Sequence, residues 1–261
     1  MVTRASAVLA FLVGTSLLVA CGSDRSGDEV HVVTLGDSVA FDADLGIRAA
    51  LEAVEGVTVD TRSFGGVGLL RPGFDEYLGD ALDADPDVLT LMLGGWDLGE
   101  AMDDPGAYGE RVEEVAARVI ESGAHLVWIG MPVTPPDEGI EEHRLHLNGI
   151  VRAALGQVHG ADYLDSDRAL ASADGTFVRQ RFGLDGTLQP IRKLRDGVPD
   201  GHLCPTGAAR MGQLVADELH TLGITVVEVG DPTAGHPQGE WWVGEWTSDP
   251  RYDDPPGGCD A

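Results

Sequence analysis

Short apolar runs alternate with longer amphipathic segments over most of this 261-residue chain. Runs that are apolar on both faces are typical of strands buried in a parallel sheet, and the segments between them are long enough for helices. The predicted strands are 30–35, 57–62, 88–93, 125–131 and 161–165, with 224–229 as a sixth strand at the sheet edge. The predicted helices lie near 43–54, 74–83, 106–122, 141–158 and 205–222.

This order predicts an α/β fold, a three-layer α/β/α sandwich with a central parallel sheet and a flavodoxin-like strand order. The domain is expected to span residues 29–230. Residues 231–261 are rich in Trp, Gly and Pro and have no periodicity, so they are expected to form a tail packed on the domain. Hydrophobic residues make up 43% of the chain, which is enough for a sizeable core.

The first twenty residues have the pattern of a secretory signal: one cation, Arg4, precedes an apolar run that ends in small residues. The run is too short and wrongly flanked for a stable membrane span. Leu18-Val19-Ala20-Cys21 resembles a bacterial lipobox, which predicts a lipidated Cys21 and a flexible tether over 21–28. The alternative is ordinary signal cleavage nearby. We expect an exported protein, lipid-anchored at the outer face of a bacterial cell membrane.

The formal net charge is −27, from 17 basic and 44 acidic residues. Such a surface repels nucleic acid and anionic lipid head groups. Nucleic-acid binding is therefore excluded, and membrane contact is expected only through the lipid anchor.

Ligands of open α/β sheets bind beyond the carboxyl ends of the strands, so site residues are expected in the loops after the predicted strands. Ser38 follows the first strand in "LGDSVAFD". Its hydroxyl could cap the next helix. Alternatively it is a nucleophile beside helix N-terminal amides, which could stabilise a developing oxyanion.

Three further loops end at the same edge of the sheet. The second loop, "RSFGGVGLLRPG", contains Gly65, Gly66 and Gly68 and can present bare backbone to a ligand or form a simple turn. The third is Gly94-Gly95-Trp96-Asp97, and the last places Asp200 and His202 ahead of the final helix. A hydroxyl nucleophile needs a base and a group that orients the base, and Ser38, His202 and Asp200 supply those types.

These motifs resemble the SGNH/GDSL-type hydrolases, whose pattern is GDS, a glycine loop, G-x-N-D and a late D-x-x-H. The resemblance covers roughly residues 30–222. It implies Ser38 as nucleophile, His202 as base and Asp200 as orienting carboxylate. It also implies oxyanion or binding roles for Gly68, with Gly66 as second choice, and for the block that holds Trp96 and Asp97.

Two positions depart from the family pattern. Trp96 replaces the asparagine of G-x-N-D, so an amide donor is missing, although an indole N–H is also a donor. Loss of one oxyanion donor costs about 3–4 kcal/mol in the transition state. Asp200 and His202 are two residues apart and not three, with Pro199 in the expected position. Asp200 is favoured as the orienting group, and Asp196 is the alternative.

With Cys21 assigned to lipid, Cys204 and Cys259 remain and are predicted to form a disulfide, as an exported chain permits. Metal binding by these two isolated cysteines is the weaker alternative. His143 and His146 lie on one face of a predicted helix but lack a third zinc ligand, so a solvated face is favoured.

The tail tryptophans Trp241, Trp242 and Trp246 favour packing over a sugar-binding platform. No G-x-G-x-x-G follows the first strand, and the only lysine, Lys193, is not in a Walker motif. We therefore predict no metal and no cofactor.

The late block and Trp-rich tail resemble SGNH domains fused to actinobacterial membrane acyltransferases. That resemblance implies an ester substrate such as an acylated envelope carbohydrate, and a membrane acyltransferase as a candidate partner. We therefore predict a serine esterase or O-acyltransferase, with water or a sugar hydroxyl as acceptor. The alternative is a non-catalytic SGNH-fold protein that binds an envelope glycan or an acyltransferase.

Overall fold

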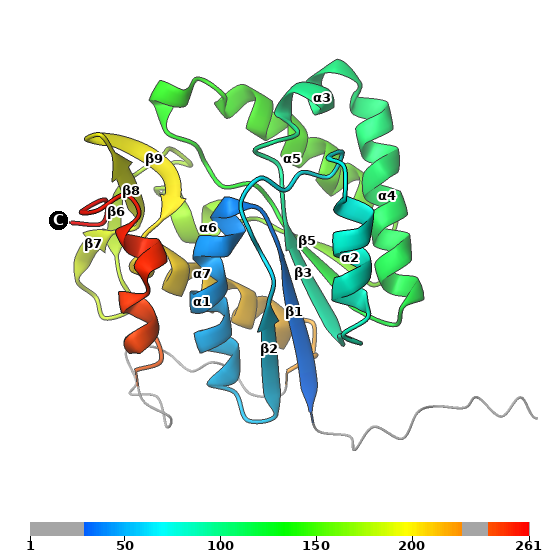
Figure 1. The fold of residues 1–261 in the computed structure, drawn as a ribbon, viewed down its shortest axis with the longest axis horizontal. Coiled ribbons are helices and arrows are strands. Elements are labelled where there is room, and N and C mark those ends of the chain that lie inside the picture. The colour runs from blue at the N-terminus through cyan, green and yellow to red at the C-terminus, as the bar shows by residue number, and fades with distance from the viewer. Residues whose placement is uncertain (1–28, 226–239, 261) are drawn as a thin grey trace, which may run out of the picture.

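A five-stranded parallel sheet forms the centre of the computed structural model, which describes residues 29–225 and 240–260 (Figure 1). Every neighbouring pair of strands is parallel, and their order is β2-β1-β3-β4-β5. The strands are β1 (Val30–Gly36), β2 (Val57–Thr61), β3 (Val88–Met92), β4 (His125–Ile129) and β5 (Ala161–Leu164). This is the flavodoxin-like order, so the predicted fold class is confirmed.

Helices cover both faces of the sheet (Figure 1). α1 (Ser38–Glu52) and α7 (Pro205–Thr221) pack on one face, and the other face is covered by α2 (Phe74–Leu82), α4 (Pro105–Glu121) and α5 (Glu141–Leu155). Neighbouring strand residues such as Val32 and Val33 enter opposite cores. Because strand side chains alternate between faces, a sheet covered on both sides needs continuous apolar runs.

Some element boundaries differ from those predicted. α1 begins five residues earlier than the pattern suggests, because Asp37 caps it directly after β1. The short helices α3 (Leu98–Asp103) and α6 (Asp167–Leu170) were not predicted. In the predicted sixth strand, Ile224 and Thr225 are not in a strand, and the other positions lie outside the described residues.

Two antiparallel hairpins interrupt the α/β order between α6 and α7. They are β6 (Gln180–Phe182) with β7 (Leu188–Pro190), and β8 (Arg192–Arg195) with β9 (Val198–Leu203). These strands are three to six residues long and lack the alternation of apolar residues that marks a half-buried strand, so the hairpins were not predicted. β9 contacts α1, which brings the second hairpin beside the first helix.

The described C-terminal segment, residues 240–260, packs on the domain next to α1 and α7. Trp241 and Trp242 are buried in the same core cluster as these helices, and Trp246 packs edge-to-face on Tyr252. The segment contains the short helices η2 (Glu245–Ser248) and η3 (Pro250–Asp253). Trp241 and Trp242 are each 8% exposed, so these two rings are too buried to serve as a sugar platform.

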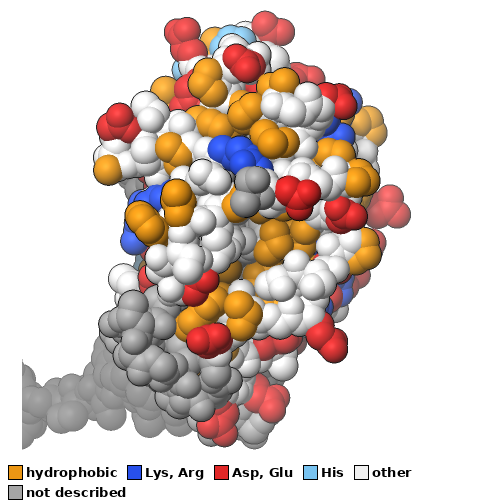
Figure 2. Space-filling view, turned by 90° about the vertical axis from the view of Figure 1, so that its left-hand side faces the viewer, with side chains coloured by type: hydrophobic (Ala, Val, Ile, Leu, Met, Phe, Trp, Pro, Cys, Tyr) orange, Lys and Arg blue, Asp and Glu red, His pale blue; other side chains and the backbone are white. Residues whose placement is uncertain are grey.

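The predicted signal, the tether and Cys21 lie outside the described residues. Among the helices that are described, none is long and apolar enough to cross a membrane. Asp and Glu side chains are scattered over the face shown in Figure 2, in keeping with the acidic composition.

Candidate active site

Ser38 is the first residue of α1, immediately beyond the carboxyl end of β1. The helix cap is Asp37, whose Oδ1 accepts the backbone N–H groups of Val39 at 2.9 Å and Ala40 at 3.5 Å. The capping role considered for Ser38 therefore belongs to its neighbour. Gly36 permits the close approach of β1 and β3 here, since a Cβ at this position would lie 2.3 Å from the Met92 carbonyl oxygen.

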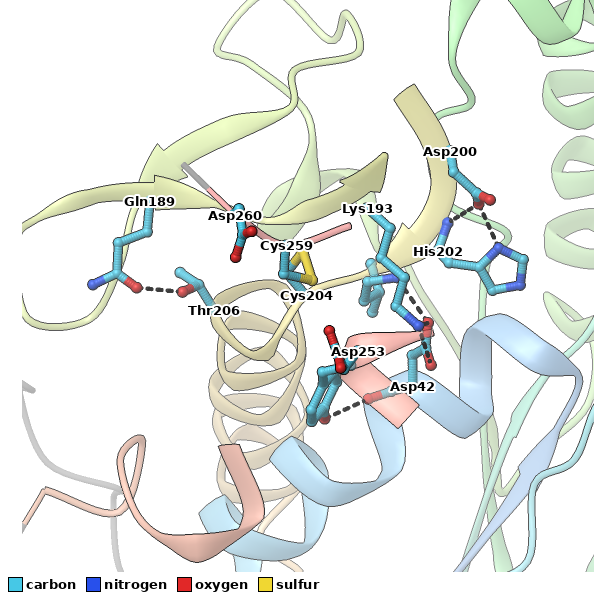
Figure 3. The surroundings of a disulfide bond; sticks show 12 residues. Asp42, Gln189, Lys193, Asp200, His202, Cys204, Thr206, Asp253, Cys259 and Asp260 are labelled. Carbon is cyan, nitrogen blue, oxygen red and sulfur yellow. Dashed lines mark hydrogen bonds and ion pairs between the residues drawn. A yellow bond between two sulfur atoms is a disulfide. The ribbon is translucent and has the colours of Figure 1, made fainter. Parts of the chain in front are cut away.

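The Ser38 hydroxyl meets the imidazole of His202, which reaches it from β9. The distance from Ser38 Oγ to His202 Nε2 is 2.9 Å. The other ring nitrogen, Nδ1, contacts the carboxylate of Asp200, which also accepts the His202 backbone N–H at 2.8 Å (Figure 3). The three side chains thus form a continuous hydrogen-bonded relay, although 164 positions separate Ser38 from His202.

The two-residue spacing of Asp200 and His202 follows from their place on a strand. Residues i and i+2 of a strand point to the same side, so the two side chains can meet. Asp196, the alternative orienting group, lies in the β8–β9 turn with a φ of 54°, and His202 bonds Asp200. The structure thus brings Ser38, His202 and Asp200 together and leaves Asp196 outside the relay.

Asp200 and His202 each favour the charged form of the other. The hydrogen bond to Asp200 outweighs burial and raises the pKa of His202 above its ordinary value of 6.5. Burial alone would raise the pKa of Asp200, but hydrogen bonds from His202 and Arg195 lower it well below its ordinary range. Arg195 Nε donates to Asp200 Oδ2 at 2.8 Å. Asp200 is therefore ionised, and the imidazole has increased basicity.

Asp37 is a buried carboxyl that the sequence analysis did not assign to the site. Burial raises its pKa to about 6, against the effect of backbone N–H donors and of nearby His202. It lines the same pocket as Ser38. The signal for its structural role was present in the sequence, since aspartate is a preferred residue immediately before a helix.

A cavity of about 270 Å³ opens beside the relay. Ser38, His202 and Asp200 form part of its wall together with the polar residues Asp37, Thr134 and Glu138. Most of the exposed wall area is apolar, contributed largely by Val39, Met92, Leu93, Trp96, Met131, Pro132 and Ile140. This apolar pocket beside a nucleophile suits the acyl part of an ester.

Glu138 and the other residues of the loop after β4 were also missed by the sequence analysis. Glu138 lies in the short helix η1 (Pro136–Glu138) and faces Gly201. Burial and the nearby Asp200 raise its pKa. Its position beyond the carboxyl end of a buried strand was the only signal for a role at the site.

The residues predicted to bind the oxyanion do not all line the pocket beside Ser38. Trp96 lines the pocket, is 47% exposed, and has the Arg71 guanidinium 4.9 Å from its ring centre. Gly66 and Gly68 instead line a neighbouring hollow with Arg71. Gly65 of the same loop lies beside the nucleophile, since a Cβ at this position would lie 3.8 Å from the Cβ of Ser38.

Asp97 holds the glycine loop in place. Its Oδ2 accepts the N–H of Leu69 at 2.7 Å, and its Oδ1 accepts that of Leu70 at 3.4 Å. A Cβ on Gly68 would lie 2.6 Å from Asp97 Oδ1, so only glycine fits against this carboxylate. Asp97 is 1% exposed and is absent from the pocket wall.

The remaining predicted positions lie away from the relay. Cys204 and Cys259 form a disulfide with a Cα–Cα distance of 5.5 Å. His143 and His146 are exposed on α5, as expected for a solvated helix face. Within 29–225 and 240–260, no three His, Cys, Asp or Glu side chains gather in a way that could hold a metal ion.

A parallel sheet in this order, with a serine after β1 and a late aspartate–histidine pair, defines the SGNH/GDSL hydrolase fold. Solved structures share this fold with the chain and are only weakly similar to it in sequence. TesA is 20% identical, with a TM-score of 0.53 over 74% of this chain and 99% of TesA. A lipase/acylhydrolase from Enterococcus faecalis is 16% identical, with a TM-score of 0.52 over 74% and 96% of the two chains.

A variant of Axe2, an acetyl xylan esterase from Geobacillus stearothermophilus, is 14% identical, with a TM-score of 0.53 over 77% of this chain and 98% of its own. No match was found among curated proteins. Residues 31–218 match the family described as "Protein of unknown function (DUF459)", and the chain belongs to that family.

Proposed function

We propose that the protein is a serine esterase or O-acyltransferase that uses Ser38, His202 and Asp200. The observation that carries the proposal is the continuous relay from Ser38 Oγ through the imidazole to a strongly acidic carboxylate. The apolar cavity beside Ser38 adds a place for an acyl group. Structural neighbours that are described as esterases and lipases support the same class of reaction.

The proposed reaction has two halves. In the first, Ser38 Oγ attacks the ester carbonyl carbon while its proton passes to His202 Nε2. The imidazolium, stabilised by Asp200, then gives that proton to the leaving alcohol as the C–O bond breaks. In the second half, water or a sugar hydroxyl loses a proton to His202 and attacks the acyl carbonyl carbon. The bond from that carbon to Ser38 Oγ then breaks, His202 returns the proton to Oγ, and an acid or a new ester is released.

The negative charge of the tetrahedral intermediate needs hydrogen-bond donors. We assign one to the backbone N–H of Ser38 at the start of α1, where the helix dipole favours an anion. The second donor is assigned to the glycine loop: Gly68 by family resemblance, or Gly65 by its proximity to Ser38. Trp96 occupies the position of the family's asparagine and is the feature that favours a second candidate, a non-catalytic protein that binds an envelope glycan or an acyltransferase.

The proposed substrate is an acylated carbohydrate of the cell envelope or a similar ester, and a membrane acyltransferase is the proposed partner. We further propose export and attachment through a lipidated Cys21. β1 begins at the end of the sheet opposite the pocket, because Ser38 follows the carboxyl end of the same strand. A tether joined at this end would therefore attach to the domain at the end opposite the pocket.

Labelling with a fluorophosphonate probe tests the proposal, using residues 22–261 beside Ser38→Ala and His202→Ala. We expect the wild type to label and both variants to lose at least about 10³-fold in labelling rate, because nucleophile and base act as one unit. Ser248→Ala and His143→Ala, both exposed and absent from the pocket wall, are matched controls that should label normally. A folded wild type that fails to label would instead support the binding protein.

A further inference from the structure

A buried ion pair lies one helical turn beyond Ser38. Asp42 on α1 and Lys193 on β8 are 3% and 4% exposed, and the lysine Nζ lies 3.1 Å from Oδ1 and 3.0 Å from Oδ2. Asp42 Oδ2 also accepts the backbone N–H of Leu203 at 3.0 Å. Leu203 directly follows His202, so this carboxylate of the serine-bearing helix holds the histidine-bearing strand.

The C-terminal segment completes this group of contacts (Figure 3). Lys193 Nζ donates to the carbonyl oxygen of Arg251 at 2.7 Å, and the Tyr252 hydroxyl donates to the carbonyl oxygen of Asp42 at 2.8 Å. The backbone N–H of Leu194 donates to the carbonyl oxygen of Gly258 at 2.7 Å. Helix α1, the β8–β9 hairpin and residues 250–258 therefore meet around one ion pair.

Stability alone does not explain why charges occupy this place. Removing two ions from water costs several kcal/mol for each, and well-packed apolar side chains usually serve stability as well or better. A buried ion pair with further hydrogen bonds does, however, impose a definite geometry on the elements it joins. Here those elements are the helix with Ser38 and the strand with His202, whose side chains must meet within hydrogen-bond distance.

We propose that Asp42 and Lys193 are positioning residues, which hold the β8–β9 hairpin against α1 so that His202 Nε2 meets Ser38 Oγ. The inference rests on the proposed function, because it assigns the pair a role in the same relay. Neither side chain lines the pocket or contacts the nucleophile, so both act through His202.

The pair also acts on His202 electrostatically. The groups that face the imidazole are Asp200 on its own strand, Asp42 in α1, the cap residue Asp37, Glu138 in η1, and Lys193 on β8. Asp42 raises the pKa of His202 and Lys193 lowers it. Neutralising Asp42 alone should therefore lower the pKa of the imidazole, and neutralising Lys193 alone should raise it. A purely structural role would not produce these opposite shifts.

The test compares Asp42→Asn, Lys193→Met and the double variant with wild type by the rate of fluorophosphonate labelling as a function of pH. Labelling requires neutral His202, so its rate rises with pH through the pKa of that residue. We expect Asp42→Asn to move this rise to lower pH and Lys193→Met to move it to higher pH. Both should lower the plateau rate about tenfold or more, and the double variant should return the rise toward its wild-type pH while the plateau stays low.

Arg111→Met is the matched control, since it removes one cation from a surface ion pair on α4. It should leave both the pH of the rise and the plateau unchanged. Lys193→Arg keeps the charge. We expect its labelling rate to rise at the same pH as in wild type and to reach a plateau between those of Lys193→Met and wild type. Folding of each variant is checked by circular dichroism, and the arginine variant carries the test if Lys193→Met does not fold.

Folded single variants with wild-type plateau and pH dependence would overturn the inference, as would shifts in the same direction. NMR titration of the His202 ring separates this inference from the proposed function. If wild type does not label, the proposed function fails, yet opposite shifts of the ring pKa in the two variants would still support coupling of the pair to His202. Unchanged ring pKa values would refute that coupling independently of any activity.

Discussion

At the scale of single residues, the candidate site depends on how Asp200 sets the state of His202. The carboxylate bonds Nδ1, so the ring presents Nε2 to Ser38. A proton placed on Nδ1 leaves Nε2 as the acceptor that a general base requires. The same hydrogen bond raises the pKa of His202, which means that the base is protonated over a wider range of acidic pH.

The rate of ester hydrolysis should therefore rise with pH, and the midpoint of this rise should lie above pH 6.5. The raised pKa of His202 places the change from imidazolium to imidazole there. Asp200→Asn removes the largest cause of that shift, so the rise should move to lower pH. The maximal rate should fall by roughly 10³- to 10⁴-fold because the ring loses its orienting anion. A pH–rate profile with a chromogenic ester measures both effects.

Asp196→Asn is the matched control, because Asp196 lies in the adjacent turn outside the relay. It should leave the profile unchanged. If Asp196→Asn produced the loss and Asp200→Asn did not, the assignment of the orienting carboxylate would be wrong.

The raised pKa of His202 also makes the free energy of unfolding depend on pH. The protonated ring is favoured in the folded state, so its contribution is fully present below pH 6.5 and is lost as pH rises through the raised value. Asp200 acts oppositely: its contribution is present above its ordinary value of 3.8 and is lost as pH falls toward the lowered value.

At the scale of elements, the close packing of α1 on α7 places Ser38 on a rigid helix. Two glycines make this contact possible. A Cβ on Gly46 would lie 2.1 Å from the carbonyl oxygen of Ala208, and one on Gly212 would lie 2.2 Å from the carbonyl oxygen of Gly46. The backbones of the two helices therefore touch directly, which only glycine permits.

Gly46→Ala should lower the free energy of unfolding by roughly 1–3 kcal/mol, because the added methyl group meets backbone and no flexible side chain can yield. Gly149→Ala on α5 is the matched control, since its added methyl group meets nothing within 4 Å. That variant should gain up to about 1 kcal/mol from reduced chain entropy. Urea unfolding measures both, and equal effects at the two positions would contradict the helix contact.

At the scale of the whole molecule, the disulfide joins the start of α7 to the C-terminal segment. Cys204 and Cys259 are 55 residues apart, and Cys204 lies two residues after His202. The crosslink therefore closes a loop that contains α7 and ties the segment with Arg251 and Tyr252 to the hairpin of the relay. It acts on stability chiefly by limiting the unfolded chain.

Replacing both cysteines by serine in residues 22–261 should lower the free energy of unfolding by up to about 4 kcal/mol, the loop-closure value for a crosslink of this length. Denaturant unfolding of wild type with and without a reductant gives the same comparison without mutation. The double-serine variant should not respond to reductant, which makes it the internal control. Wild-type stability that is insensitive to reduction would contradict a stabilising crosslink.

The sequence alone determined the layered architecture. Strands buried on both faces must be apolar throughout, and helices that cover them must be amphipathic, so the alternation of the two patterns leaves little choice of fold. It also placed Ser38 at the edge where the parallel strands end, because Ser38 follows the first strand. His202 was singled out by its residue type and its place ahead of the final helix, and not by a predicted strand.

Tertiary structure alone decided which groups meet at that edge. The sequence favoured Asp200 over Asp196, but the contact of Asp200 with His202 depends on strand β9, whose sequence carries no clear periodicity. The proximity of Gly65 to Ser38, the place of Glu138 in the pocket wall and the Asp42–Lys193 pair became visible only when distant segments were brought together. Local patterns report which face of an element is buried, whereas contacts across more than a hundred residues depend on how whole elements pack.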